Sequence, residues 1–141
     1  PGVRVLPAAR AVKKLGKLAR NQQEALIETL GAMDHPADVI LVNASTDHPL
    51  CFSPLGLATQ ETVVVASASG AAITDAYALI KKVSLGYSRR HFRILLNKVK
   101  SAADAAAIHG NLAQLARQRG VALLEFAGHI PLDDALRHAA K

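Results

Sequence analysis

A hydrophobic run, Ile40–Val42, leads directly into the polar stretch Asn43–Asp47. In nucleotide-binding α/β proteins a buried strand of this kind ends in an aspartate, whose carboxylate holds a magnesium-bound water. Here the residue is Asn43, whose neutral amide is a poorer partner for that water. The stretch therefore predicts a strand end with the position of a metal-binding carboxylate but without the carboxylate.

A phosphate-binding loop requires a glycine-rich turn followed by Lys and then Ser or Thr. The one Gly-Lys pair of the sequence, Gly16-Lys17, is followed by Leu18, and Ala11 stands where the first glycine belongs. We interpret this pair as part of a helix. The stretch Ser67–Gly70 joins a predicted strand to a predicted helix. It is compatible with an anion site at a helix N-terminus, or with a plain turn of small polar residues.

Residues with metal-binding or nucleophilic chemistry are scattered along the chain. His48 and Cys51 form one pair of potential ligands, but no second pair follows at a suitable spacing. No serine lies in a nucleophile elbow, and Asp133-Asp134 is typical of a helix cap. The remaining histidines are His35, His91, His109, His129 and His138. We therefore predict no metal site.

Length and composition indicate one globular domain over residues 1–141. Half of the residues are hydrophobic and 20% are charged, which excludes a disordered chain. No apolar run approaches the roughly 20 residues of a membrane span. Cys51 is the single cysteine, so the chain has no internal disulfide, as is typical of a reducing cytoplasm. We expect a cytoplasmic protein.

The net charge of +6 raises the question of an acidic partner. The densest basic cluster lies between Lys13 and Arg20, and no aromatic side chain stands among its residues to stack on bases. The dispersed charge favours a solvated helix face. A weak contact with nucleic acid or with an anionic membrane surface is the alternative.

Strand-type and helix-type segments alternate along the chain. A capping box at Asn21–Glu24 predicts the start of one helix. A second helix, with Ile80 on its buried face, is expected to end at Gly86. Ser101 begins a long helix that Gly120 ends, and the range 131–140 forms a short last helix. The predicted strands are Val3–Leu6, Asp38–Asn43, Thr62–Ser67, Phe92–Asn97 and Ala122–Ala127.

This alternation predicts a three-layer α/β fold, a parallel sheet with helices on both faces. In such sheets ligands bind beyond the carboxyl ends of the strands. Four segments should therefore share one edge: Asn43–Asp47, Ser67–Gly70, Asn97–Ser101 and Gly128–Pro131. We expect any ligand site to lie along this edge.

The segment Ala72–Lys81, with the sequence AITDAYALIK, resembles a helix of the MinD/ParA-type ATPases, in particular the flagellar-number regulators called FlhG, FleN or YlxH. Three further stretches resemble the same family in order and spacing: Gly2–Ala8, Ile94–Val99 and Gly128–Asp133. The resemblance covers nearly the whole chain, but only the carboxyl-terminal part of the family's length.

The resemblance implies a P-loop NTPase-like fold that binds ATP and magnesium between two subunits and acts as a nucleotide-switched dimer. It implies that Asn97 hydrogen-bonds the edge of the adenine and that the turn at Ile130 and Pro131 packs against the base. It also places Asn43 at the Walker B position of the family, where an aspartate is expected.

The chain departs from the family pattern in three places. It contains no P-loop or signature lysine, Asn43 replaces the Walker B aspartate, and Ala68–Ala72 replaces the family's turn before the helix. We therefore expect no catalytic residues and no ATPase activity in this chain. We expect a regulatory domain that acts through a protein partner or a homodimer, in flagellar or cell-positioning regulation by resemblance. Two alternatives stay open: the carboxyl-terminal part of an active ATPase whose P-loop lies upstream, and a basic nucleic-acid-binding module.

A strand that the family has is absent from this sequence. In the family the P-loop strand lies between the strands that correspond to Asp38–Asn43 and Thr62–Ser67. Unpaired strand edges are costly because their N–H and C=O groups lack partners. We therefore expect these two strands to pair directly or to be covered by a dimer contact.

Overall fold

The computed structural model describes residues 2, 3, 5, 17–32, 37–44, 59–133 and 135. The chain divides into two compact units, Pro1–Thr59 and Gln60–Lys141, each with its own internal contacts. The second unit contains a sheet made of three of the five predicted strands, and the first unit contains one described helix.

In the first unit, helix α2 spans Arg20–Gly31. Its N-cap is Ala19, whose backbone N–H donates a hydrogen bond of 3.0 Å to Oε1 of Gln22. The expected start at Asn21 is therefore wrong, because the side chain that reaches back to the cap belongs to Gln22 instead of Glu24. Leu26 of this helix is half-buried.

The predicted strand Asp38–Asn43 is wrong, since none of its residues lies in a strand. Val39 and Leu41 are 72% and 89% exposed, and they pair with no strand of the described residues. A hydrophobic run becomes a strand only where another strand supplies hydrogen-bond partners. The expected direct pairing with Thr62–Ser67 is not among the strand pairs of the described residues. Of the predicted strand Val3–Leu6, the described residues Val3 and Val5 are exposed and lie outside any strand.

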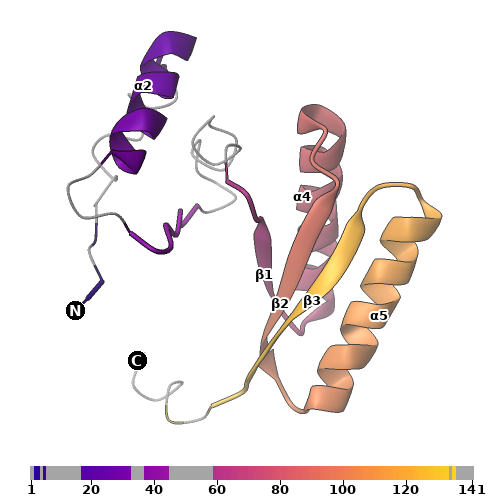
Figure 1. Ribbon diagram of the computed structural model, residues 1–141. Coiled ribbons are helices and arrows are strands. Elements are labelled where there is room, and N and C mark those ends of the chain that lie inside the picture. Colours follow the sequence, from indigo (N-terminus) through magenta and orange to yellow (C-terminus); the bar gives the residue numbers. More distant parts are fainter. Residues whose placement is uncertain are drawn as a thin grey trace. The chain divides into compact units, whose positions relative to one another are not determined.

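The second unit is a parallel three-stranded sheet with flanking helices, in the order β1-β2-β3 (Figure 1). Its elements along the chain are β1 (Val63–Ser67), α4 (Gly70–Tyr87), β2 (His91–Val99), α5 (Ala102–Gln118) and β3 (Leu123–Pro131). Both strand pairs are parallel, as the helical crossovers predict. This parallel α/β sheet with flanking helices is consistent with a P-loop NTPase-like fold and confirms the α/β fold class. The expected helices on both faces of the sheet are not found among residues 60–133, where α4 and α5 cover one face.

One face of the sheet carries the core. Alternate strand residues are buried there, including Ile94 and Leu96, which are fully enclosed. Helices α4 and α5 contact these strands and each other, so they cover the same face. Two right-handed crossovers that advance in the same direction across a sheet must place both helices on one side. Among residues 60–133 no helix covers the opposite face.

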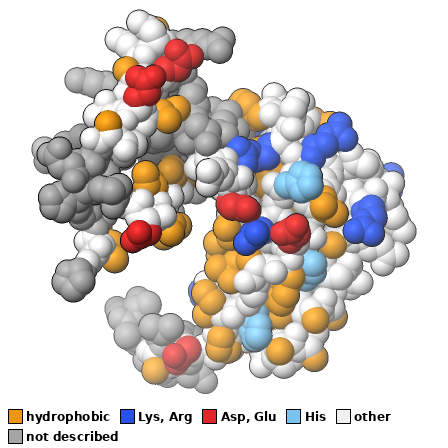
Figure 2. Space-filling view, viewed as in Figure 1, with side chains coloured by type: hydrophobic (Ala, Val, Ile, Leu, Met, Phe, Trp, Pro, Cys, Tyr) orange, Lys and Arg blue, Asp and Glu red, His pale blue; other side chains and the backbone are white. Residues whose placement is uncertain are grey.

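The opposite face carries the other set of alternate residues. Val63 and Val65 are 49% and 58% exposed on it. Arg93 Nε lies 3.1 Å from Oε2 of Glu61 and 3.5 Å from Oε2 of Glu125, so one guanidinium joins two acidic side chains across the strands. Figure 2 shows hydrophobic side chains gathered over the strands beside acidic and basic ones.

The helix ends follow local rules, with one exception. Helix α5 begins at the Ser101 cap and is followed by Gly120, whose φ of 62° is left-handed, and both boundaries were predicted. Helix α4 continues past Gly86 to Tyr87, and its C-cap Ser88 takes the left-handed conformation with a φ of 56°. The buried Ser84 hydroxyl donates a hydrogen bond to the carbonyl of Val121 and joins α4 to the segment before β3. No helix of the described residues is long and apolar enough to cross a membrane.

Candidate functional site

Three residues lie side by side where the strands reach the carboxyl-terminal edge of the sheet. Ser67 of β1 is the register partner of Asn97 of β2, and Asn97 is the partner of Ile130 of β3. Neighbouring residues at one register position of a parallel sheet point to the same face. These three residues, called here the strand-end row, therefore point to the face that α4 and α5 leave uncovered.

Asn97 supplies the hydrogen-bonding group of the strand-end row. Its side-chain amide presents a carbonyl acceptor and an NH₂ donor side by side. The residue is half-buried, and its amide makes no hydrogen bond with another described side chain. A donor–acceptor pair of this kind matches the edge of a purine base, as asparagine does when it pairs with adenine.

Ile130 supplies apolar surface beside this amide, and Pro131 follows it at the end of β3. Ile130 is 41% exposed, and Pro131, which ends β3, is exposed as well. The backbone here is fixed, because Pro131 is the register partner of Val99 and the Leu132 N–H donates a 2.8 Å hydrogen bond to the Val99 carbonyl. A flat apolar surface next to an amide can hold an aromatic base by packing on one side and hydrogen bonding at its edge.

The two strand-to-helix turns at this edge are occupied by their own caps. Ser69 Oγ accepts a 3.3 Å hydrogen bond from the Ala72 N–H and lies 3.3 Å from Ser67 Oγ. This favours the interpretation of Ser67–Gly70 as a plain turn. At the next turn, Ser101 Oγ accepts from the Asp104 N–H at 3.1 Å and donates to Asp104 Oδ2 at 2.8 Å. The carboxylate of Asp104 disfavours an anion at the start of α5.

The structure thus brings together three of the four segments predicted at this edge. Asn43 belongs to the other unit, is exposed, and does not end a strand. Its correspondence to the Walker B position stays a prediction.

Asp133 behaves as a cap, since its Oδ1 accepts a 2.8 Å hydrogen bond from the Ala135 N–H. His48, Cys51, His35 and His138 lie outside the described residues.

No metal site is found in the part of the chain that the structure describes. None of its His, Cys, Asp and Glu residues form a group of three that could hold an ion. His109 packs instead against Phe126, with ring centroids 5.1 Å apart, and its Nε2 is buried without a hydrogen-bond partner. His109 therefore serves the contact between α5 and β3.

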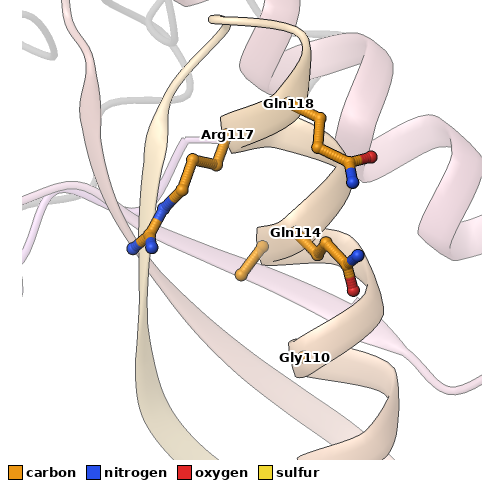
Figure 3. Close-up of a pocket in the computed structure, with 5 residues that line it drawn as sticks. Gly110, Gln114, Arg117 and Gln118 are labelled. Atoms are coloured by element: carbon orange, nitrogen blue, oxygen red, sulfur yellow. The ribbon is translucent and has the colours of Figure 1, made fainter.

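A shallow hollow of about 280 Å³ lies on α5, and Gly110, Gln114, Arg117 and Gln118 are among its lining residues (Figure 3). The side chains of Gln114 and Gln118 point to one side of the helix and Arg117 to the other. Because α5 runs back from the carboxyl-terminal edge of the sheet, this part of it lies near the opposite edge. The hollow is therefore separate from the strand-end row.

Two backbone features of the edge were not predicted. Lys98 has a left-handed φ of 58°, and Gly128 has a φ of 130°. Both lie at irregularities in the pairing of β2 with β3. A glycine within a strand pattern often marks a bulge, so Gly128 carried a signal that could have been used. At Lys98 the signal is the strand alternation, because a period of two would place this lysine on the same face as Ile94 and Leu96.

Comparison with known proteins gives one curated relative. The chain is 28% identical over 140 residues to the antiactivator FleN of Pseudomonas aeruginosa strain PAO1. The match covers 99% of this chain and 50% of FleN, so the chain spans about half the length of that relative. No family model matches the chain. The similarity to FleN extends over nearly the whole chain and confirms the resemblance to the FlhG/FleN group.

Proposed function

We propose that this chain is a FleN-like regulatory domain that binds an adenine nucleotide at the strand-end row and acts through contact with another protein. The observation that carries the proposal is the register that places Asn97 beside Ile130. It combines a paired donor and acceptor with an exposed apolar surface on one face of the sheet. These are the two elements that recognition of a flat purine base requires.

The regulatory part of the proposal rests on the relative. The relative FleN is an antiactivator, a name that denotes a regulator acting against an activator. We propose that the present chain likewise acts as a regulator, by binding a partner protein or a second copy of itself. The dispersed positive charge supports a protein partner over nucleic acid, because nucleic-acid binding relies on clustered phosphate contacts.

We further propose that the chain by itself does not hydrolyse ATP. Catalysis of phosphoryl transfer depends on a cradle of backbone N–H groups, a lysine and a held magnesium ion. The sequence contains no such cradle, and Asn43 has no charge with which to hold a magnesium-bound water. Serine side chains cap the helices at both described turns of the edge, so these turns do not favour a phosphate site. The strand-end row is therefore proposed as a site for the base alone.

Titration calorimetry with ADP tests the proposed site. Asn97→Ala should weaken ADP binding about tenfold, since a hydrogen-bonding side chain in a binding site typically contributes 1–3 kcal/mol. The matched control is Asn111→Ala, which makes the same change at an exposed position of α5 and should leave the affinity unchanged. Binding that is equal in the two variants, or absent from the unmutated chain, would contradict the proposed site.

A further inference from the structure

The pairing of β2 with β3 changes register just before the strand-end row. Up to Ile94, which faces Phe126, the two strands advance together. Then β3 advances by two residues, from Phe126 to Gly128, while β2 advances by one, from Ile94 to Leu95. Ala127 is therefore the extra residue of a β-bulge on β3.

A second shift of opposite sense follows directly after the row. Here β2 advances by two residues, from Asn97 to Val99, while β3 advances by one, from Ile130 to Pro131. Lys98 is the extra residue, this time on β2. The two shifts cancel, so that only the pairs between them are displaced by one residue relative to the rest of the ladder.

Each shift depends on an unusual backbone conformation. Gly128 has a φ of 130°, a value that only glycine adopts without strain, although a Cβ at this position would meet no atom within 4 Å. Lys98 has a φ of 58°, which residues other than glycine seldom adopt. A side chain at Gly128 would therefore be disfavoured by the backbone angle and not by lack of space.

The conformation of Lys98 has a physical reason. In an uninterrupted strand, the period of two would place Lys98 on the same face as Ile94 and Leu96, which are completely buried. A lysine ammonium buried there without a partner would be costly. In the structure Lys98 is exposed, and the next residue, Val99, is completely buried in its place.

We propose that Gly128 is the positioning residue that sets the register of the strand-end row, and that Lys98 is the positioning residue that ends this register directly after the row. Without the first shift, Asn97 would face His129; with it, Asn97 faces Ile130. Without the second shift, Lys98 would be buried and Val99 would not hold Leu132 and Pro131 at the edge. The functional meaning of this register rests on the proposed nucleotide site, whereas the register itself can be tested without nucleotide.

Two substitutions at Lys98 separate backbone angle from side-chain charge. Lys98→Gly removes the charge but adopts a positive φ freely, while Lys98→Val removes the charge and strongly disfavours a positive φ. Lys100→Val is the matched control, because it removes an exposed lysine next to the bulge. The two readouts are the affinity for ADP and the hydrogen-exchange rate of the Leu132 amide, which bonds the Val99 carbonyl.

Lys98→Gly and Lys100→Val should each bind ADP within about twofold of the unmutated chain and keep the Leu132 amide protected. Lys98→Val should bind about tenfold more weakly and exchange that amide faster. If the valine variant fails to fold, Lys98→Ala takes its place and should exchange Leu132 faster than Lys98→Gly does.

Two results would overturn the inference. Unchanged protection of Leu132 in both the valine and the alanine variants would show that Lys98 does not control the register. An equal loss of ADP affinity in the glycine and valine variants would assign the effect to the charge. If the unmutated chain binds no ADP, the proposed function fails, and the exchange rates alone still decide the role of Lys98.

Discussion

Asn97 of β2 lies opposite Ile130 of β3, and both point to the face of the sheet that α4 and α5 leave uncovered. An amide and an exposed branched side chain are adjacent there although 32 residues separate them in sequence. Parallel pairing brings them together, since each strand delivers its last residues to the same edge. The strand-end row is therefore a product of topology and of the two register shifts beside it.

ATP hydrolysis by this chain should not exceed a buffer blank in the presence of magnesium. The substitution Asn43→Asp should leave this result unchanged, because a carboxylate at position 43 does not replace the missing phosphate cradle. Release of inorganic phosphate measures the activity. A magnesium-dependent turnover in the unmutated chain would contradict the expectation.

Leu96→Ala should destabilise the sheet unit by about 2–5 kcal/mol, because Leu96 is completely buried between the strands and the helices. Leu85→Ala is the matched control on α4, where the side chain is 66% exposed, and it should change stability by less than about 0.5 kcal/mol. Urea unfolding followed by circular dichroism measures both. Similar losses in the two variants would argue against the core described here.

Substitution of two glycines by alanine should have opposite effects. Gly110 lies within α5 with open space around it, so Gly110→Ala should stabilise the helix by about 0.5–1 kcal/mol. Gly120 has a φ of 62°, so Gly120→Ala should cost about 1–2 kcal/mol despite equally open surroundings. Unfolding midpoints measured for the pair check the prediction. A change of the same sign in both would show that the left-handed turn after α5 is not required.

Arg93→Met should reduce stability by less than about 1 kcal/mol. The Arg93 side chain and its partners Glu61 and Glu125 are about half exposed, and water and salt screen such ion pairs strongly. The unfolding free energy of the unmutated chain should approach that of the variant as salt is raised from low to molar concentration. A loss of stability that persists at high salt would contradict a screened ion pair as the origin of the effect.

Local sequence patterns were sufficient for β1, β2 and α5. The runs Thr62–Ser67 and Phe92–Asn97 form strands within two residues of the expected bounds, because both are rich in β-branched and aliphatic residues and end at turn signals. The α5 boundaries follow from the hydroxyl cap at Ser101 and the left-handed Gly120. These signals act over a few residues and need no knowledge of the rest of the fold.

Properties that depend on distant partners could not be predicted. Asp38–Asn43 has the composition of a buried strand but no described strand beside it, and its side chains are exposed. Likewise, β3 continues past Ala127 to Pro131 because β2 supplies partners for it. The pairing of Asn97 with Ile130 instead of His129 depends on the bulge before Gly128, and a glycine in a strand pattern indicates a bulge without specifying the register that follows it.

The most direct test of the strand-end row is a titration of the isotope-labelled chain with ADP, followed by nuclear magnetic resonance. The side-chain NH₂ signals of Asn97 and the methyl signals of Ile130 should shift together and saturate at one affinity. The signals of Gly110 and Gln118, which line the separate hollow on α5, should stay in place. Shifts confined to α5, or no saturable shift at Asn97 and Ile130, would contradict an adenine-binding site at this edge of the sheet.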